Sequence, residues 1–255
     1  MGHLAEILAQ KHSELASLRA RALPAPPARR PVALNRAANG GRLSLITEIK
    51  RRSPSAGQLS TVLSISERAA AYERAGASML SVLCDPHFFD GDYQHLVEAR
   101  AATQLPLLCK EFVIDELQLD AASAFGADAV LLIVRCLSPA RTLELIQAAR
   151  ARQLVPFVEV VTEEELAVAL DGGADLIGVN ARDLDTLVMD AARAARVLAA
   201  IPTAITRVRL SGLAKPEDVT RLKASGADAA LVGEALMRAD DPEPLLRSLA
   251  AAAAL

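Results

Sequence analysis

The sequence predicts a (β/α)8 barrel, and three observations favour that fold. The first is a recurring motif in which a helix-like run is followed by a glycine and then by a short apolar strand. Its four copies read AGASMLSVL, FGADAVLLI, GGADLIGVN and SGADAALVG. The second is the spacing of these copies, about fifty residues, which is the length of two strand–helix units. The third is a further apolar strand halfway between copies. Eight such units fit 255 residues and close into parallel strands covered by helices.

An open, doubly wound sheet is the alternative fold for alternating strands and helices. A turn of the form G-x-G-x-x-G after the first strand is typical of that fold. The first strand predicted here is followed by RRSPSAG instead. The barrel is therefore the prediction.

The first 43 residues differ in pattern from the rest. We expect residues 1–43 to be an N-terminal helical extension and connector of a single domain that spans residues 1–255. Apolar residues recur at helical spacing between Leu4 and Arg21, which predicts an amphipathic helix. Residues 22–31 (ALPAPPARRP) contain four prolines and predict a stiff, extended connector. A second short helical segment is expected before Gly40.

Beyond residue 43 the predicted strands and helices alternate. Outside the repeats, the predicted strands are Leu45–Lys50, Leu107–Lys110, Pro156–Val161 and Thr206–Ser211. The clearest helical runs are Ile65–Ala75, Ala140–Arg152, Glu163–Leu170 and Glu217–Ala224. The glycine of each repeat follows a helix, where it supplies the left-handed residue that ends the helix.

Composition and charge exclude several classes of function. A net charge of −3 and an aromatic content of 3% come without a basic stripe, so we expect no nucleic-acid partner. No apolar run reaches the ~18 residues that span a bilayer, and the N-terminus MGHLAEILAQ lacks the apolar segment of a signal peptide. We therefore expect a cytoplasmic protein that does not bind membranes.

The three cysteines, Cys84, Cys109 and Cys136, are far apart and form no C-x-x-C pair. A disulfide framework is therefore not expected. Each lies near the end of a predicted strand, which leaves a thiolate metal site as an alternative, but histidines and carboxylates at ligand spacing are missing.

Glu48 and Lys50 lie two residues apart at the end of the first predicted strand. Side chains at i and i+2 project from one face of a strand, so an acid and a base point to the same place. An edge strand with a solvated, charged face is the alternative interpretation.

Further polar residues follow other predicted strands, namely Lys110, Glu159, Asn180 and, shortly after it, Arg182. In a barrel of this kind the active site lies at the carboxyl ends of the strands. Burying such groups is costly unless they are paired, and pairing around a ligand accounts for several of them at once. An internal salt-bridge network without chemistry is the alternative.

Glycines follow the last two predicted strands, as Ser211-Gly212 and Gly233-Glu234. Backbone N–H groups beside glycines at the starts of helices bind anions, and the loops after strands seven and eight of these barrels commonly hold a phosphate. Tight turns without a ligand are the alternative.

Seven blocks of the chain resemble the indole-3-glycerol-phosphate synthase family of tryptophan biosynthesis, over nearly its whole length. They read EIKRRSPSAG, SVLCDPHFFDGD, PLLCKEFVID, VEVVTEEEL, GVNARDLDT, LSGLAKPED and VGEALMRADDP. The resemblance implies ring closure, decarboxylation and dehydration of 1-(2-carboxyphenylamino)-1-deoxyribulose 5-phosphate. It implies a carboxy-lyase with neither metal nor organic cofactor. We expect a monomer, with a weak dimer as the alternative.

The resemblance also implies roles for the strand-end residues. Lys110 is implied as general acid and Glu159 as acid/base. Lys50 would pair with substrate anions, Glu48 would orient the lysines, and Asn180 would hold a substrate hydroxyl. The remaining implied contacts are Ser53, Arg182, Leu210 and Ser211 in the pocket, Gly212, Gly233 and the amide of Glu234 at the phosphate, and the loop Arg51–Ser60 as a cover. Because crowded, partly buried lysines have lowered pKa values, we expect them to act as acids near neutral pH.

Several positions depart from the family's pattern, among them Cys109, Glu111 and Ala181, and the departure with the largest consequence is in strand seven. A glutamate typically precedes the Ser-Gly pair of strand seven, and this chain has Leu210 there. The departure leaves two alternatives to an ordinary synthase. One is a divergent paralogue with an altered substrate or reaction, and the other is a non-catalytic module that binds phosphosugars.

Overall fold

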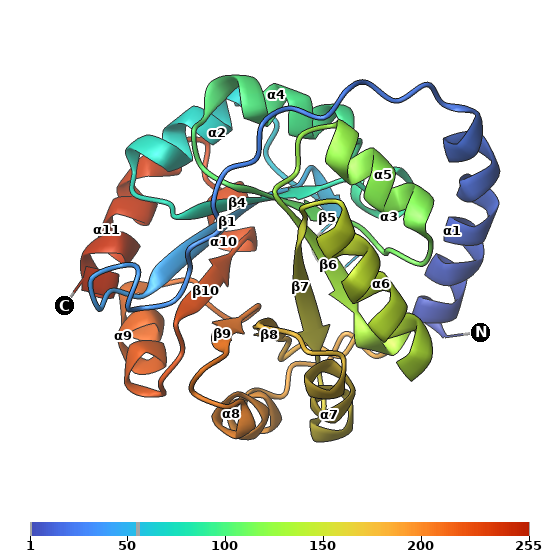
Figure 1. Cartoon of the computed structure of the whole chain (residues 1–255). Coiled ribbons are helices and arrows are strands. Elements are labelled where there is room, and N and C mark those ends of the chain that lie inside the picture. The colour runs from blue at the N-terminus through green and yellow to red at the C-terminus, as the bar shows by residue number, and fades with distance from the viewer. Residues whose placement is uncertain (1, 55–56, 255) are drawn as a thin grey trace.

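A computed structural model describes residues 2–54 and 57–254, and its parallel strands form a closed barrel (Figure 1). Around the barrel, each strand is hydrogen-bonded to the next, and the last pairs with the first. The strands are β1 (Ser44–Ile49), β4 (Met79–Leu83), β5 (Leu107–Lys110), β6 (Ala129–Ile133), β7 (Val155–Val160), β8 (Leu176–Val179), β9 (Thr206–Arg209) and β10 (Ala229–Val232). The predicted (β/α)8 barrel is confirmed.

Helices surround the barrel, and short segments lie at its rim (Figure 1). The helices are α1 (His3–Ala20), α2 (Ile65–Arg74), α3 (Pro86–Phe89), α4 (Gln94–Ala102), α5 (Glu116–Ala124), α6 (Pro139–Ala151), α7 (Glu163–Asp171), α8 (Ala191–Ala200), α9 (Pro216–Ala224), α10 (Glu234–Met237) and α11 (Glu243–Ala254), with a 3₁₀ turn η1 (Val134–Cys136). A small antiparallel pair, β2 (Arg52–Ser53) and β3 (Gly57–Gln58), follows β1. The four helices expected from periodicity correspond to α2, α6, α7 and α9.

The strands are buried on both faces, which is why they read as continuous apolar runs. Alternate residues face opposite sides of the sheet. Leu45 packs in an outer cluster with residues of the helices, whereas Ile46 packs in an inner cluster with Phe157 from the far side of the barrel. Complete burial of a side chain of this size contributes roughly 1.5–3 kcal/mol to folding. The inward positions therefore hold the barrel closed, and the same alternation sets which strand-end residues point inward.

The repeats have a structural role at the amino ends of the strands. The residue two positions after each glycine is small and polar, and in three repeats its side chain accepts a hydrogen bond from the first or second amide of a neighbouring strand. Ser78 accepts from Leu45 (3.3 Å), Asp128 from Leu107 (2.8 Å) and Asp228 from Arg207 (2.9 Å). Such bonds pair backbone donors that strand starts leave free. The repeated Gly-Ala-Asp pattern is thus a device for joining strands.

The N-terminal segment contacts both ends of the barrel, through α1 at the carboxyl ends of the strands and through the connector at their amino ends. α1 places Ile7 in the inner cluster, and the connector crosses from α1 over the amino ends of the strands (Figure 1). There the Arg30 amide donates to Asp128 (2.7 Å). The prediction of a short helix before Gly40 is wrong, because residues 35–41 form turns. Asn35 accepts a local hydrogen bond from the Ala38 amide, and Gly40 has φ of +61°, both of which oppose a helix.

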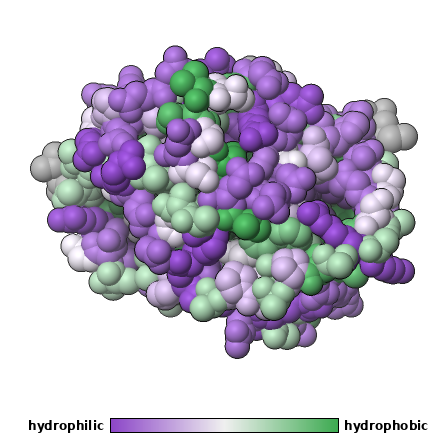
Figure 2. All heavy atoms as spheres, turned by 90° about the horizontal axis from the view of Figure 1, so that it is seen from above, coloured by the Kyte–Doolittle hydropathy of each residue, from purple (hydrophilic) through white to green (hydrophobic). Residues whose placement is uncertain are grey.

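The face seen in Figure 2 is hydrophilic over most of its upper part, and hydrophobic residues gather at its top and in a band across its lower half. Within residues 2–54 and 57–254, no helix combines the length and the apolar character needed to cross a bilayer. Cys84 and Cys109 are buried, and all three cysteines are free thiols.

Candidate active site

A cavity of about 580 Å³ opens at the carboxyl ends of the barrel strands. Every position predicted for the site lies in its lining, which includes Glu48, Lys50, Ser53, Lys110, Glu159, Asn180, Arg182, Leu210, Ser211, Gly212, Gly233 and Glu234. Lys110 and Glu159 come from strands far apart in the sequence, and they share this one cavity. Their location follows from the strand alternation, since each lies two residues beyond an inward-facing apolar residue, Leu108 or Phe157.

Glu48 connects the two lysines of the cavity. Its carboxylate contacts Lys50 Nζ through Oε1 and Lys110 Nζ through Oε2, each at 2.5 Å. β1 lies between β10 and β4 and is not an edge strand, and Glu48 is only 1% exposed. The alternative of a solvated edge is therefore wrong. Burial by itself raises a carboxyl pKa, but the two ammonium groups outweigh it and lower the pKa of Glu48 to about 2.

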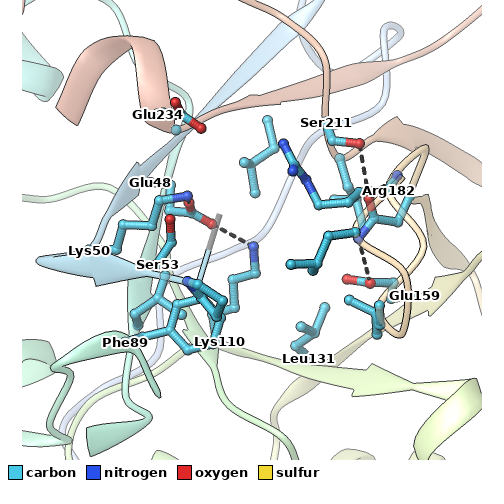
Figure 3. A pocket seen from close by; sticks show the side chains of 18 of the residues that line it. Glu48, Lys50, Ser53, Phe89, Lys110, Leu131, Glu159, Arg182, Ser211 and Glu234 are labelled. Carbon is cyan, nitrogen blue, oxygen red and sulfur yellow. Dashed lines mark hydrogen bonds and ion pairs between the residues drawn. The ribbon is translucent and has the colours of Figure 1, made fainter. Parts of the chain in front are cut away.

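The Lys110 ammonium lies in the middle of the cavity, with Glu48 on one side and Glu159 on the other (Figure 3). Burial acts to lower the Lys110 pKa, but the attraction of Glu48 and then of Glu159 is stronger, so the pKa is raised above its ordinary value. The expectation of a lowered pKa is thus wrong for Lys110, because the lysines are interleaved with carboxylates. The Lys110 side chain is therefore an ammonium group at neutral pH.

Glu159 lies at the other side of the cavity and starts a chain of hydrogen bonds. Asn180 Nδ2 donates to Glu159 Oε1 (2.9 Å), and the Ser211 hydroxyl donates to Asn180 Oδ1 (2.9 Å). Ser211 in turn accepts from the amide of Ala181 (3.0 Å), and Asn180 Oδ1 also accepts from the amide of Arg182 (2.9 Å). These bonds fix the orientation of the Asn180 amide, and with it one oxygen of Glu159.

The pKa of Glu159 is raised above its ordinary value. Burial is the main cause, and the charge of Lys110 and the hydrogen bond from Asn180 oppose it only in part. Glu48 and Glu159 are both buried, yet their pKa values move in opposite directions. Two carboxyl groups whose environments separate their pKa values in this way are suited to different tasks, one as a fixed charge and one as a proton carrier.

The glycines after β9 and β10 lie on the part of the rim that is across the barrel from Lys110 of β5. Gly212 has φ of +88°, which suits glycine. At Gly233 a Cβ atom would lie 2.5 Å from Glu48 Oε1, so only glycine leaves room for that carboxylate. The Glu234 side chain accepts from Arg238 Nε (3.0 Å), and this pairing offsets its charge beside the proposed anion site.

Several cavity residues were not predicted individually. An apolar wall is formed by Phe89, Phe112, Leu131, Ile133 and Leu184. The apolar strand faces predicted that such a wall exists, but not which residues form it. His3 and Ile7 of α1 also border the cavity. Their helical spacing indicated a buried face without indicating what that face covers. Ser53 lines the cavity from β2, while Ser55 and Ala56 of the predicted covering loop lie outside the described residues.

A metal site finds no support in the part of the chain that the structure describes. No group of three or more histidine, cysteine, aspartate or glutamate side chains in residues 2–54 and 57–254 has a geometry that could hold a metal ion.

Solved structures with a similar shape support the fold alone. A 3-hexulose-6-phosphate synthase superimposes with a TM-score of 0.65 at 18% identity, covering 82% of this chain and 99% of that one. A thiamine phosphate pyrophosphorylase from Pyrococcus furiosus gives 0.62 at 20% identity, with 83% and 96% covered.

Sequence comparison is far more specific. The family model described as indole-3-glycerol phosphate synthase matches residues 2–249. A protein of that name from Exiguobacterium sp. is 40% identical over 98% of this chain and 96% of its own length. Indole-3-glycerol phosphate synthase 2 of Streptomyces coelicolor is 45% identical over 88% of this chain and 86% of its own length. The chain therefore belongs to the indole-3-glycerol phosphate synthase family.

Proposed function

We propose that this chain is an indole-3-glycerol-phosphate synthase, a carboxy-lyase that converts 1-(2-carboxyphenylamino)-1-deoxyribulose 5-phosphate to indole-3-glycerol phosphate, carbon dioxide and water. The observation that carries the proposal is one cavity in which Lys110 lies between Glu48 and Glu159, facing a glycine rim. Membership of the family supplies the substrate class. The cavity volume of about 580 Å³ is in the range of sites that enclose small molecules.

Ring closure needs a proton at the ketone. The ring carbon that carries the carboxylate attacks the ketone carbon, a carbon–carbon bond forms, and the ketone oxygen takes a proton. Lys110 is the donor that we assign to this oxygen, because it is charged, central and held by Glu48. Carbon dioxide then leaves with its bonding electrons returned to the ring. Stabilising the developing oxyanion in a dry site is commonly a large catalytic contribution.

Dehydration needs an acid and a base on opposite sides of the substrate. After solvent has reprotonated Lys110, the new hydroxyl takes a second proton from it and leaves as water. The adjacent carbon loses a proton, and the electrons of that C–H bond form the double bond of the indole. Glu159 is the base that we assign to this proton. Its raised pKa makes it a better base than an ordinary carboxylate, and Asn180 fixes its orientation.

The two ends of the cavity suit the two ends of the substrate. The apolar wall that includes Phe89 and Leu131 lies on one side, and Ser211 and Glu234 lie on the other (Figure 3). We assign the carboxyphenyl ring to the wall and the phosphate to the amides of Gly212, Gly233 and Glu234. Lys50 and Arg182 provide positive charge for the two anionic groups of the substrate.

Leu210 adds an apolar surface where the family's pattern has a glutamate. It is 5% exposed and packs over Gly178, so closely that a Cβ there would lie 2.7 Å from Leu210 Cδ1. Leu210 thus belongs to the inner apolar cluster. The proposed reaction does not require a third carboxylate, since Glu48 holds the lysines and Glu159 is the base.

The test is turnover of the ribulose phosphate substrate by the purified protein, followed by the fluorescence of the indole product. We expect turnover by the parent and a loss of about 10²-fold or more in kcat for Glu159→Gln. Glu217→Gln, on a surface helix away from the cavity, is the matched control and keeps the parent rate. Binding of the substrate without any product would instead favour a non-catalytic phosphosugar-binding module.

A cytoplasmic location and a monomeric state complete the proposal. A biosynthetic family that acts on a small phosphosugar supports the first. The cavity is built from the residues of one chain, which supports the second. Sedimentation equilibrium at several protein concentrations tests the monomer, and a mass that rises to twice that of the chain contradicts it.

A further inference from the structure

The N-terminal helix carries a buried lysine that the proposed reaction does not use. Lys11 lies on α1, and only 1% of it is exposed. His3 and Ile7 precede it at a spacing of four residues, so the three lie on one face of the helix. His3 and Ile7 border the active-site cavity. Lys11 lies on the same face, where α1 meets the segments that follow β4 and β5.

The Lys11 ammonium is fully paired with carboxylates. Its Nζ lies 2.5 Å from Asp85 Oδ2, 2.8 Å from Glu111 Oε1 and 2.8 Å from Glu14 Oε2. Three carboxylates therefore surround the ammonium, which donates a hydrogen bond to Glu14 Oε2 and forms ion pairs with Asp85 and Glu111. Glu14 is on α1 itself, but Asp85 follows β4 and Glu111 follows β5. One cation therefore joins the helix to two separate segments at the barrel rim.

Both rim carboxylates also hold main chain that carries residues of the active site. Asp85 Oδ1 accepts from the amides of Phe88 (2.6 Å) and Phe89 (3.1 Å), and thereby fixes the turn that brings Phe89 to the apolar wall. Glu111 is the residue after Lys110, and its Oε1 accepts from the amide of Phe112 (2.8 Å). The position of each carboxylate thus determines the course of the backbone beside a cavity residue.

Lys11 supplies the positive charge that Asp85 and Glu111 face. Asp85 and Glu111 are buried, and both approach the same ammonium. Burial of Glu111, opposed by Lys11 and reinforced by Asp85, raises its pKa to about 7. Removal of the ammonium leaves these carboxylates facing one another out of water. They then have to separate or take up protons, and either response moves the backbone that they hold.

We propose that Lys11 is a positioning residue, which holds Asp85 and Glu111 so that the segments carrying Phe89 and Lys110 are fixed against α1. The inference rests on the proposed function only in taking Lys110 as catalytic.

The kinetic test compares Lys11→Met with Arg100→Met. Arg100 is a matched control, because its largely buried side chain also pairs with a carboxylate, Asp128, but at the opposite end of the barrel. Both variants are assayed well below their melting temperatures, with the folded fraction measured by unfolding curves. We expect Lys11→Met to lower kcat by about tenfold or more, as small misplacements of catalytic groups do. Arg100→Met keeps kcat within about twofold of the parent, and Lys11→Arg, which retains the charge, recovers most of the loss.

A spectroscopic test is independent of turnover. The chain has five lysines, and the side-chain ammonium signal of Lys110 in ¹⁵N–¹H spectra is identified by its loss in Lys110→Arg. We expect this signal to shift in Lys11→Met and to keep its position in Arg100→Met. A shift together with an inactive parent refutes the proposed function and leaves the positioning role standing. An unmoved Lys110 signal, with kcat equal to that of Arg100→Met, overturns the positioning role.

Discussion

The two ends of the barrel both bury carboxylates, but they use them differently. At the amino ends of the strands, Asp128 accepts from the amides of Leu107 (2.8 Å) and Arg30 (2.7 Å) and pairs with Arg100. At the carboxyl ends, Glu48 is held by the side chains of two lysines that also border the cavity. Main-chain donors are committed to the fold, whereas lysine side chains can turn toward a ligand.

Burial of a charged group does not by itself indicate a function. Asp128 and Glu48 are both almost inaccessible to water. Asp128 joins the connector, α4 and β5, so it contributes to stability. Glu48 contacts Lys110 and raises its pKa, so in the proposed reaction it contributes to chemistry. Substitutions at the two ends should therefore affect different measurements, and four experiments test how far this separation holds.

The largest expected effect is the loss of activity in Lys110→Ala. Removal of the proposed acid should lower kcat by about 10²- to 10⁴-fold, the range typical of acid–base groups. Glu48 keeps its contact with Lys50 (2.5 Å), so the melting temperature should change little. Steady-state turnover and thermal unfolding measure the two quantities. The separation fails if the variant retains near-parent turnover or unfolds at a much lower temperature.

The reverse result is expected for Asp128→Ala at the other end. The change leaves the amides of Leu107 and Arg30 without this acceptor and breaks the ion pair with Arg100, whose guanidinium keeps its hydrogen bonds to backbone carbonyls. We expect a loss of about 3 kcal/mol in the free energy of unfolding, as for a broken buried charge pair. Denaturant titration measures that loss, and kcat of the folded fraction should equal the parent value. A fall in kcat beyond about threefold would show that the two ends are coupled.

The third experiment concerns the pH dependence of stability. The pKa of Glu111 is about 7 in the folded chain and 4.5 ordinarily, so between these values the folded state binds more protons than the unfolded state. Stability from this group therefore falls as pH rises from 4.5 to 7, by up to about 3 kcal/mol. Glu111→Gln should lose less stability than the parent between pH 5 and 7 in denaturant titrations. Equal slopes for the two proteins would contradict the raised pKa.

The smallest effect is expected from Leu210→Glu. A carboxylate at this position adds an acid to the cavity, as in the family's pattern, and we expect it to raise kcat by a few-fold. Burial of a carboxylate among apolar side chains opposes folding, so the free energy of unfolding should fall by about 1–2 kcal/mol. Turnover and denaturant titration on the same preparation measure both. An unchanged or lower kcat favours a pocket reshaped for another substrate.

The charged strand-end residues of the site could be predicted individually because side chains alternate between the two faces of a strand. Once the barrel is assumed, Glu48, Lys110 and Glu159 must point inward at the carboxyl ends of their strands. The direction of the Lys110 pKa shift could not be predicted in this way. It depends on the distances to Glu48 and Glu159, and these are set by strand register and barrel curvature rather than by sequence spacing.

The role of α1 is a second example. Its apolar spacing predicted a helix with a buried face, and Lys11 on that face gave no hint of its partners. Asp85 and Glu111 are far from Lys11 in the sequence, and only the docked helix brings the three together. The short helix expected before Gly40 failed for a local reason, because side-chain hydrogen bonds and glycine favour turns there.

The sequence alone determined the barrel, because a repeat of strand and helix has one economical way to bury continuous apolar strands, and it determined which residues meet at the rim. The directions of the pKa shifts depend on the tertiary structure, because the attraction between charges depends on their separation and on the exclusion of water. Neither quantity can be obtained from the order of the residues. Glu48 and Glu159 are the same residue type on two strands, and their surroundings give them opposite pKa shifts.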